Sequence, residues 1–163
     1  MKERKATFFS LAIILGFLAF RLYYIAHTGY DLSDDEAYFW DWSRHPALSY
    51  YDQGPMVAWI IRFFTSLLPL SEFSVRLGAP IFTAVSGLVL YLLTAEVTES
   101  RLLGFIVILL FHLTPIGAAG GIIMTYYAPQ VLFMSLSAFF LWRLVKDGRR
   151  KWWYLLGATM GLG

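Results

Sequence analysis

The sequence predicts an all-α integral membrane protein, a multi-span helical bundle with two juxtamembrane helices in its first outer loop. Hydrophobic residues make up 58% of the 163 residues and charged residues only 15%, whereas a soluble domain carries about 25% charged residues. The apolar residues gather in long runs, and about 20 such residues form a helix that crosses a bilayer. The charged residues lie mostly between these runs.

Charge and cysteine content exclude several classes of protein. The formal net charge of +2 is small, and the basic residues are not interleaved along one face as nucleic-acid binding requires. We therefore expect no nucleic-acid partner. The chain contains no cysteine, so disulfides and thiolate metal sites are excluded.

Four apolar runs predict membrane spans at about residues 7–26, 77–97, 102–118 and 130–145, and a fifth apolar segment begins at residue 152. The first run has no small-residue cleavage pattern, so we interpret it as a retained span rather than a signal peptide. Arg21, near its end, is expected to reach the headgroups. The fifth segment is too short to cross, so residues 1–163 are expected to be one transmembrane domain at the front of a longer membrane protein.

Residues 27–76 form a polar and aromatic loop between the first two spans. Ser33 followed by Glu36 fits a capping box, which predicts a helix from Asp34 to His45. Its aromatic residues favour a helix lying on lipid. A second juxtamembrane helix is predicted to begin near Pro55.

Basic residues precede the first span, separate the second from the third and follow the fourth. With alternating spans these positions fall on one side, which the positive-inside rule identifies as the cytoplasm. The N-terminus is then cytoplasmic, and loops 27–76 and 117–129 lie together outside.

An outward-facing carboxylate cluster beside lipid suits glycosyl transfer from a sugar linked to a lipid phosphate. The lipid tail keeps the reactive carbon at headgroup depth, and the phosphate leaves as a stable anion. The acceptor hydroxyl needs a base, which one carboxylate can supply, and basic side chains can stabilise the leaving phosphate. Direct displacement would invert the anomeric centre.

Two motifs resemble a known family: Asp-Asp-Glu-Ala-Tyr-Phe-Trp-Asp-Trp-Ser at residues 34–43 and Tyr-Asp-Gln-Gly-Pro-Met at residues 51–56. They are similar to the opening of bacterial membrane glycosyltransferases of the GT-C type. This family is named for dolichyl-phosphate-mannose protein mannosyltransferase and includes the lipid A aminoarabinose transferase. The resemblance implies a polyprenyl-phosphate sugar donor, membrane lipids as partners and the bacterial cytoplasmic (inner) membrane as location.

The resemblance also implies roles for individual residues. Asp35 matches the catalytic base, Glu36 the adjacent acid and Tyr38 the first aromatic of the motif. The remaining candidate substrate-binding residues are Asp52, Gln53, Arg62 and Arg76. Two positions depart from the family pattern: its His-Pro-Pro reads Gln-Gly-Pro at residues 53–55, and the acid expected near Tyr127 is absent.

Other interpretations stay open at this point. Glu36 can serve only as a helix cap, and His112 as a hydrogen-bonded packing residue. No cofactor is certain; a divalent metal on Asp35, Glu36 and a histidine is possible, although no ligand spacing demands one. The chain could also be a non-catalytic or truncated membrane subunit. A transporter is disfavoured because the acids gather in a loop rather than near the midplane of the spans.

Overall fold

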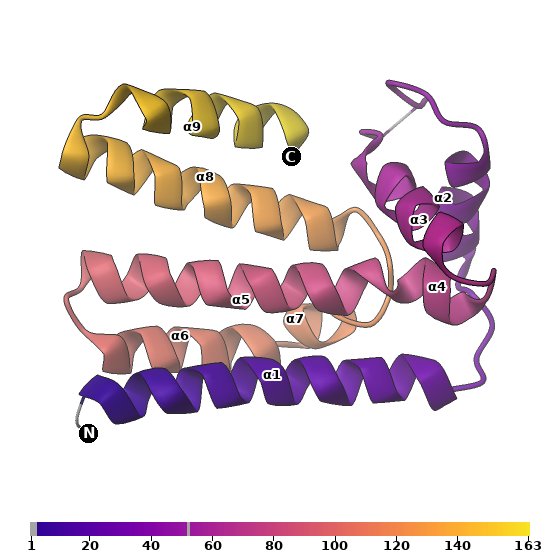
Figure 1. Cartoon of the computed structure of the whole chain (residues 1–163). Coiled ribbons are helices and arrows are strands. Elements are labelled where there is room, and N and C mark those ends of the chain that lie inside the picture. Colours follow the sequence, from indigo (N-terminus) through magenta and orange to yellow (C-terminus); the bar gives the residue numbers. More distant parts are fainter. Residues whose placement is uncertain (1–2, 52) are drawn as a thin grey trace.

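The computed structural model describes residues 3–51 and 53–163, and all regular structure within these ranges is helical. Figure 1 shows long helices lying side by side, with shorter helices across one end of the bundle. The helices of the bundle are α1 (Glu3–His27), α5 (Gly78–Val97), α6 (Arg101–Leu113), α8 (Tyr127–Asp147) and α9 (Arg150–Leu162).

Three helical stretches in the described ranges are long and apolar enough to cross a membrane: Glu3–His27, Glu72–Val97 and Tyr127–Asp147. They correspond to the first, second and fourth predicted spans. Many large apolar side chains point outward from the bundle, among them Phe8, Leu15 and Val145, as expected where the surrounding solvent is lipid. The all-α integral membrane fold predicted from the sequence is confirmed.

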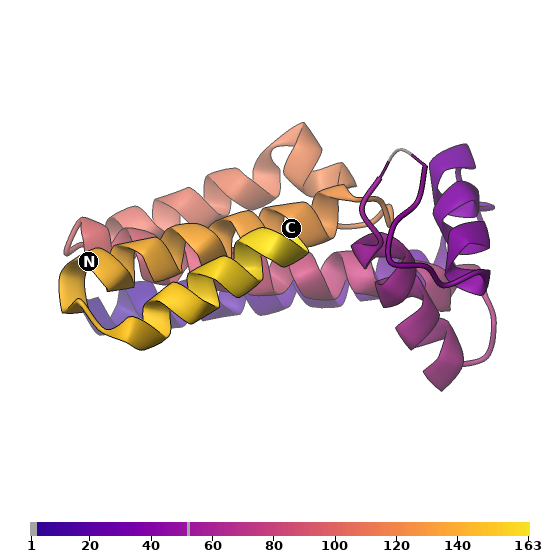
Figure 2. The same ribbon diagram turned by 90° about the horizontal axis from the view of Figure 1, so that it is seen from above.

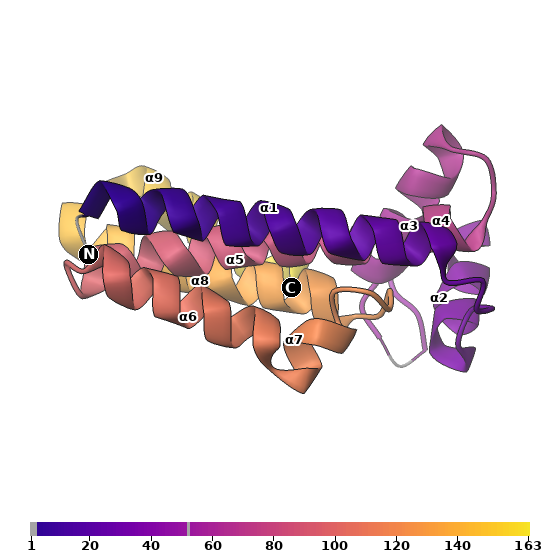
Figure 3. The ribbon, with the colours of Figure 1, turned by 90° about the horizontal axis from the view of Figure 1, so that it is seen from below.

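Helix α5 lies at the centre of the bundle. It contacts α1 and α6 on one side and α8 on the other, and the view from below shows α1 and α6 running alongside it (Figure 3). Helix α9 lies along α8 (Figure 2). The turn between them is made by Gly148, which has a φ of 63° and donates its N–H to the Leu144 carbonyl at 2.9 Å, a left-handed helix end that glycine adopts without strain.

The third predicted span is divided. Helix α6 ends at Leu113 and a short helix, α7 (Pro115–Ala119), begins at once. Pro115 has no N–H to donate and its ring clashes with the preceding turn, so the helix cannot continue through it. At 13 residues, α6 is about 20 Å long, shorter than the ~30 Å hydrocarbon core.

Arg21 does not reach the headgroups, contrary to the expectation from sequence. Its side chain is 2% exposed, and its Nη2 donates to the Gly117 carbonyl of α7 at 2.7 Å. Its Nη1 lies 3.2 Å from Nδ1 of His112. Because Arg21 can only donate, His112 Nδ1 is the acceptor, and His112 is the hydrogen-bonded packing residue that the sequence suggested. Arg21 thus gives a carbonyl of the short helix α7 a hydrogen-bond donor, as backbone at membrane depth requires.

The two ends of the bundle differ in charge. Figure 1 places the N-terminus, the α5–α6 connection and the α8–α9 connection at one end, together with most of the basic residues. The opposite end carries α2 (Asp34–Arg44), α3 (Met56–Leu67) and α4 (Glu72–Arg76), and it also receives the α7–α8 loop. We call this the α2–α4 end.

The α2–α4 end has its own apolar core. Phe39 of α2 packs with residues of α3, α4, α5, the α7–α8 loop and α8, namely Val57, Ile60, Ile61, Val75, Ala79, Met124 and Ala128. Phe39 is buried, and Trp42 stacks on Tyr50 with ring centroids 4.3 Å apart. Two of the aromatic residues of α2 therefore pack against protein, and only the others are available for contact with lipid.

Candidate active site

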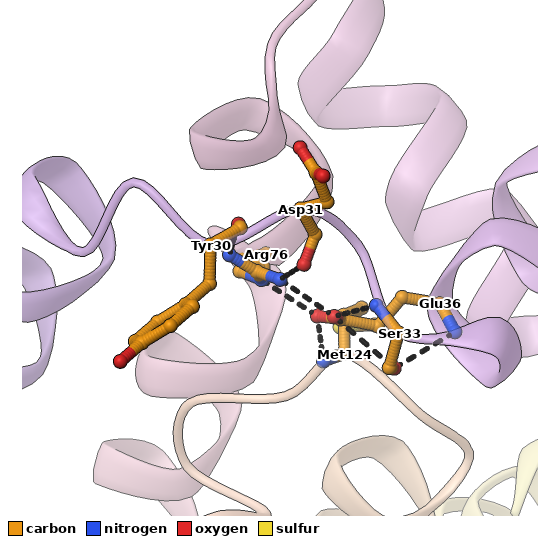
Figure 4. A network of polar contacts seen from close by, with 6 residues as sticks. All are labelled: Tyr30, Asp31, Ser33, Glu36, Arg76 and Met124. Atoms are coloured by element: carbon orange, nitrogen blue, oxygen red, sulfur yellow. Dashed lines mark hydrogen bonds and ion pairs between the residues drawn. The ribbon is translucent and has the colours of Figure 1, made fainter.

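Glu36 lies at the point where the separate parts of the α2–α4 end meet. Ser33 caps α2 in the predicted capping box, and the Glu36 side chain is fully buried. Its carboxylate accepts hydrogen bonds from Nε and Nη2 of Arg76, both at 2.9 Å, and from the N–H of Met124 at 3.0 Å. Figure 4 shows these contacts converging from α2, α4 and the α7–α8 loop. One carboxylate thus joins the two loops that the sequence placed together outside.

Arg76 is almost fully engaged by this network. Besides Glu36, it donates to the carbonyls of Tyr30 at 3.0 Å and Asp31 at 2.8 Å. A guanidinium has five N–H groups, so four are used, and the fifth, on Nη1, has no acceptor in the described part of the chain. Arg76 therefore has a single N–H left to donate to a ligand.

The surroundings of Glu36 favour its charged form. Burial alone would raise the pKa of this carboxyl group, but the hydrogen bonds from Arg76, Ser33 and Met124 and the Arg76 charge outweigh burial and lower the pKa below its usual value. A carboxylate that is buried and paired in this way stays ionised and is a poor proton acceptor.

Asp35 is adjacent to Glu36 in the sequence but differs from it in burial and in hydrogen bonding. Its side chain is exposed on the first turn of α2, one residue or about 100° of helix rotation away from Glu36. Within residues 3–51 and 53–163, no side chain forms a hydrogen bond or ion pair with it. Of the two adjacent acids of the motif, Glu36 is thus buried and paired with Arg76, whereas Asp35 is exposed and has no such partner in the described ranges.

A cavity of about 300 Å³ lies beside this network. Ser33, Glu36 and Arg76 line it, whereas Asp35, on the same turn of α2, is not among its lining residues. The remaining lining residues come from the end of α1, the following loop and the α7–α8 segment: Tyr24, Thr28, Tyr30, Asp31, Ala119, Ile122 and Ile123.

The other predicted substrate-binding residues do not gather at this cavity. Tyr38 is exposed on α2 with its ring 4.5 Å from that of Trp42. Gln53 lines a different cavity of about 420 Å³ near the end of α9. Arg62 is on α3 and lines a groove between α2 and α3. Asp52 lies outside the described residues.

In the described ranges, no group of three His, Cys, Asp or Glu side chains is placed to hold a metal ion. The Glu36 oxygens already accept from Ser33, Arg76 and Met124, so Glu36 could ligate a metal only by giving up these bonds.

Sequence reasoning missed most partners of the network. Two of the acceptors for Arg76 and one donor to Glu36 are backbone groups, those of Tyr30, Asp31 and Met124, and backbone groups leave no signature in residue type. The available signal was two opposite charges, Glu36 and Arg76, in one loop that otherwise carries mainly acids.

The fold and this network define a class: a helical integral membrane protein whose juxtamembrane helices present one free and one anchored carboxylate at the same end of the bundle. The chain belongs to the dolichyl-phosphate-mannose-protein mannosyltransferase family, whose model matches residues 52–163. The family assignment made from the motifs is therefore confirmed.

A named relative is the lipid A galacturonosyltransferase RgtD of Rhizobium johnstonii, which is 37% identical over 81 residues. The aligned stretch covers 49% of this chain and 17% of the relative, so the chain matches only a small part of that protein's length. No solved structure matches the chain.

Proposed function

We propose that the chain forms part of a membrane glycosyltransferase in which Asp35 is the general base. The sugar moves from a polyprenyl-phosphate donor to an acceptor on the outer face of the bacterial cytoplasmic membrane. The observation that carries this proposal is the difference in environment between the two adjacent acids, Asp35 and Glu36. Glu36 is buried and holds Arg76, whereas Asp35 is exposed, and only an accessible carboxylate can take a proton from a substrate hydroxyl.

The proposed step is a single displacement. The Asp35 carboxylate accepts the proton of the acceptor hydroxyl as the oxygen attacks the anomeric carbon. The bond between that carbon and the phosphate oxygen breaks, and the lipid phosphate leaves with the bonding electron pair. The attack comes from the face opposite the phosphate, so the anomeric configuration inverts. Asp35 is later reset by losing the proton to water.

The cavity lined by Ser33, Glu36 and Arg76 is the proposed position of the donor headgroup, because it adjoins the first turn of α2. The remaining N–H of Arg76 is available there for one phosphate oxygen. The relative named as a lipid A galacturonosyltransferase supports a membrane lipid as acceptor. The outward orientation rests on the basic residues at the opposite end of the bundle, which the positive-inside rule assigns to the cytoplasm.

The test compares Asp35→Asn with Asp34→Asn in the full-length protein, using a radiolabelled polyprenyl-phosphate sugar and reconstituted membranes. Asp34 is the matched control because it is also an exposed acid in the first turn of α2. Loss of a general base is expected to slow transfer by about 10²–10⁴-fold, while Asp34→Asn stays near the unmutated rate. Equal rates for the two variants would remove Asp35 from the mechanism. NMR of the product tests inversion.

A further inference from the structure

A groove of about 490 Å³ separates α2 from α3. It is distinct from the cavity beside Glu36, with which it shares no lining residue. Two arginines line it, Arg44 from the end of α2 and Arg62 from the middle of α3. The other lining residues are Trp40, Ser43, Thr65, Ser66 and Leu70.

Both guanidinium groups retain donors for a ligand. Arg62 donates from Nη1 to the Ser43 carbonyl at 3.1 Å, and in the described part of the chain no carboxylate lies within ion-pair distance of it. Arg44 lies over the Trp40 ring at 5.3 Å and 4.0 Å from an exposed Asp41 oxygen, a contact that contributes little in water. Guanidinium donors match phosphate geometry, so two such groups on one groove could together bind an anion with several oxygens.

The apolar surroundings of the groove indicate where the anion comes from. Leu70 lines the groove and is 65% exposed, and Phe63 and Leu67 are 56% and 65% exposed. These side chains lie at the α2–α4 end of a membrane-spanning bundle, where an exposed apolar helix end enters the boundary between headgroups and acyl chains. An anion held here has apolar surface beside it for a hydrocarbon tail.

We propose that the groove between α2 and α3 binds the phosphate of a membrane lipid, with Arg44 and Arg62 as ligands of the phosphate and the exposed end of α3 against the acyl chains. This goes beyond the proposed transferase activity and does not depend on Asp35. In this proposal Arg62 binds a phosphate in a groove that is separate from the cavity beside Glu36. Arg44, which the sequence analysis did not single out, binds the same phosphate.

The test places a photoreactive amino acid at Ser66 of the full-length protein in nanodiscs that contain labelled phosphatidic acid or labelled phosphatidylcholine. We expect capture of phosphatidic acid to exceed that of phosphatidylcholine, and to fall more than about tenfold in the Arg44→Gln/Arg62→Gln variant, because one charge-assisted hydrogen bond is worth about tenfold and the variant removes both guanidinium groups. The corresponding double lysine variant should retain most of the capture, because the charges remain.

A photoreactive residue at Val145, which is exposed near the C-terminal end of α8, is the control for folding and lipid content, and its capture should not depend on Arg44 or Arg62. Unchanged capture at Ser66 in the double glutamine variant overturns the proposal, as does equal capture of the two lipids. Complete displacement by millimolar inorganic phosphate would make the groove a site for a soluble anion and would also overturn it.

Discussion

Glu36 and Arg76 form a forked ion pair, with Nε and Nη2 of the arginine each 2.9 Å from a different oxygen of the carboxylate. The residues lie 40 positions apart in the sequence, on α2 and α4. Met124 of the α7–α8 loop donates to the same carboxylate. The pair thus fixes α2, and with it Asp35, against two other segments of the chain.

Removing the charge of Glu36 should lower the stability of the folded protein. In Glu36→Gln the Arg76 guanidinium stays buried without its counter-ion, and breaking a buried pair in this way costs about 3–5 kcal/mol. Thermal unfolding in detergent should show a clearly lowered midpoint. Asp35→Asn is the matched control and should unfold like the unmutated protein, because its side chain is exposed. If both variants unfold at the unmutated temperature, Glu36 does not anchor α2.

The same pair should make stability depend on pH at acidic values. The pKa of Glu36 in the folded protein is lower than its usual value, which in an unfolded chain is about 4.3. The stabilisation is therefore present in full above that value and is lost as the pH falls through the folded pKa. The difference between the unfolding midpoints of the unmutated protein and Glu36→Gln should begin to shrink as the pH falls below about 4.3, the usual value of the pKa. A constant difference between them down to pH 3 would contradict this assignment.

Gly121 should not tolerate a side chain. A Cβ at this position would overlap the guanidinium of Arg21, which cannot move without losing its bonds to Gly117 and His112. Overpacking of this kind costs about 1–3 kcal/mol, so Gly121→Ala should lower the unfolding midpoint. Gly16→Ala is the control, because a Cβ there has no neighbour within 4 Å. A Gly121→Ala midpoint at or above that of Gly16→Ala would show that the Arg21 contact has room to adjust.

The proposed orientation predicts which residues an impermeant reagent reaches. Because these 163 residues contain no cysteine, a single cysteine can be introduced without background from this part of the protein. Asp35→Cys should react with an impermeant maleimide in intact spheroplasts, and Lys151→Cys only after permeabilisation. The reverse pattern would invert the topology and move the proposed reaction to the cytoplasm.

The elements that were predictable from sequence are those set by local patterns. The long apolar runs and the Ser33 capping box both depend on neighbouring residues, and the structure has α2 end at Arg44, one residue before the predicted end. Pro115 was also a local signal, since it ends α6 and divides the third predicted span. We extended that span past Pro115 because the residues after it are apolar.

The contacts that depend on distant parts of the chain could not be predicted in this way. Nothing near Glu36 in the sequence indicates that its side chain meets Arg76 and Met124 rather than water. Likewise Arg21 was placed at the headgroups because its position near a span end suits that role, and its actual partners lie on α6 and α7. The roles of two adjacent acids therefore became distinguishable only from tertiary structure.

The most direct measurement is the transfer rate and the unfolding temperature of Asp35→Asn and Glu36→Gln, determined side by side on the full-length protein in one lipid composition. The account predicts that Asp35→Asn unfolds normally but transfers sugar about 10²–10⁴-fold more slowly, and that Glu36→Gln unfolds at a lower temperature. Normal transfer by a folded Asp35→Asn protein would contradict the assignment of Asp35 as the base and, with it, the proposal that Asp35 is catalytic while Glu36 is structural.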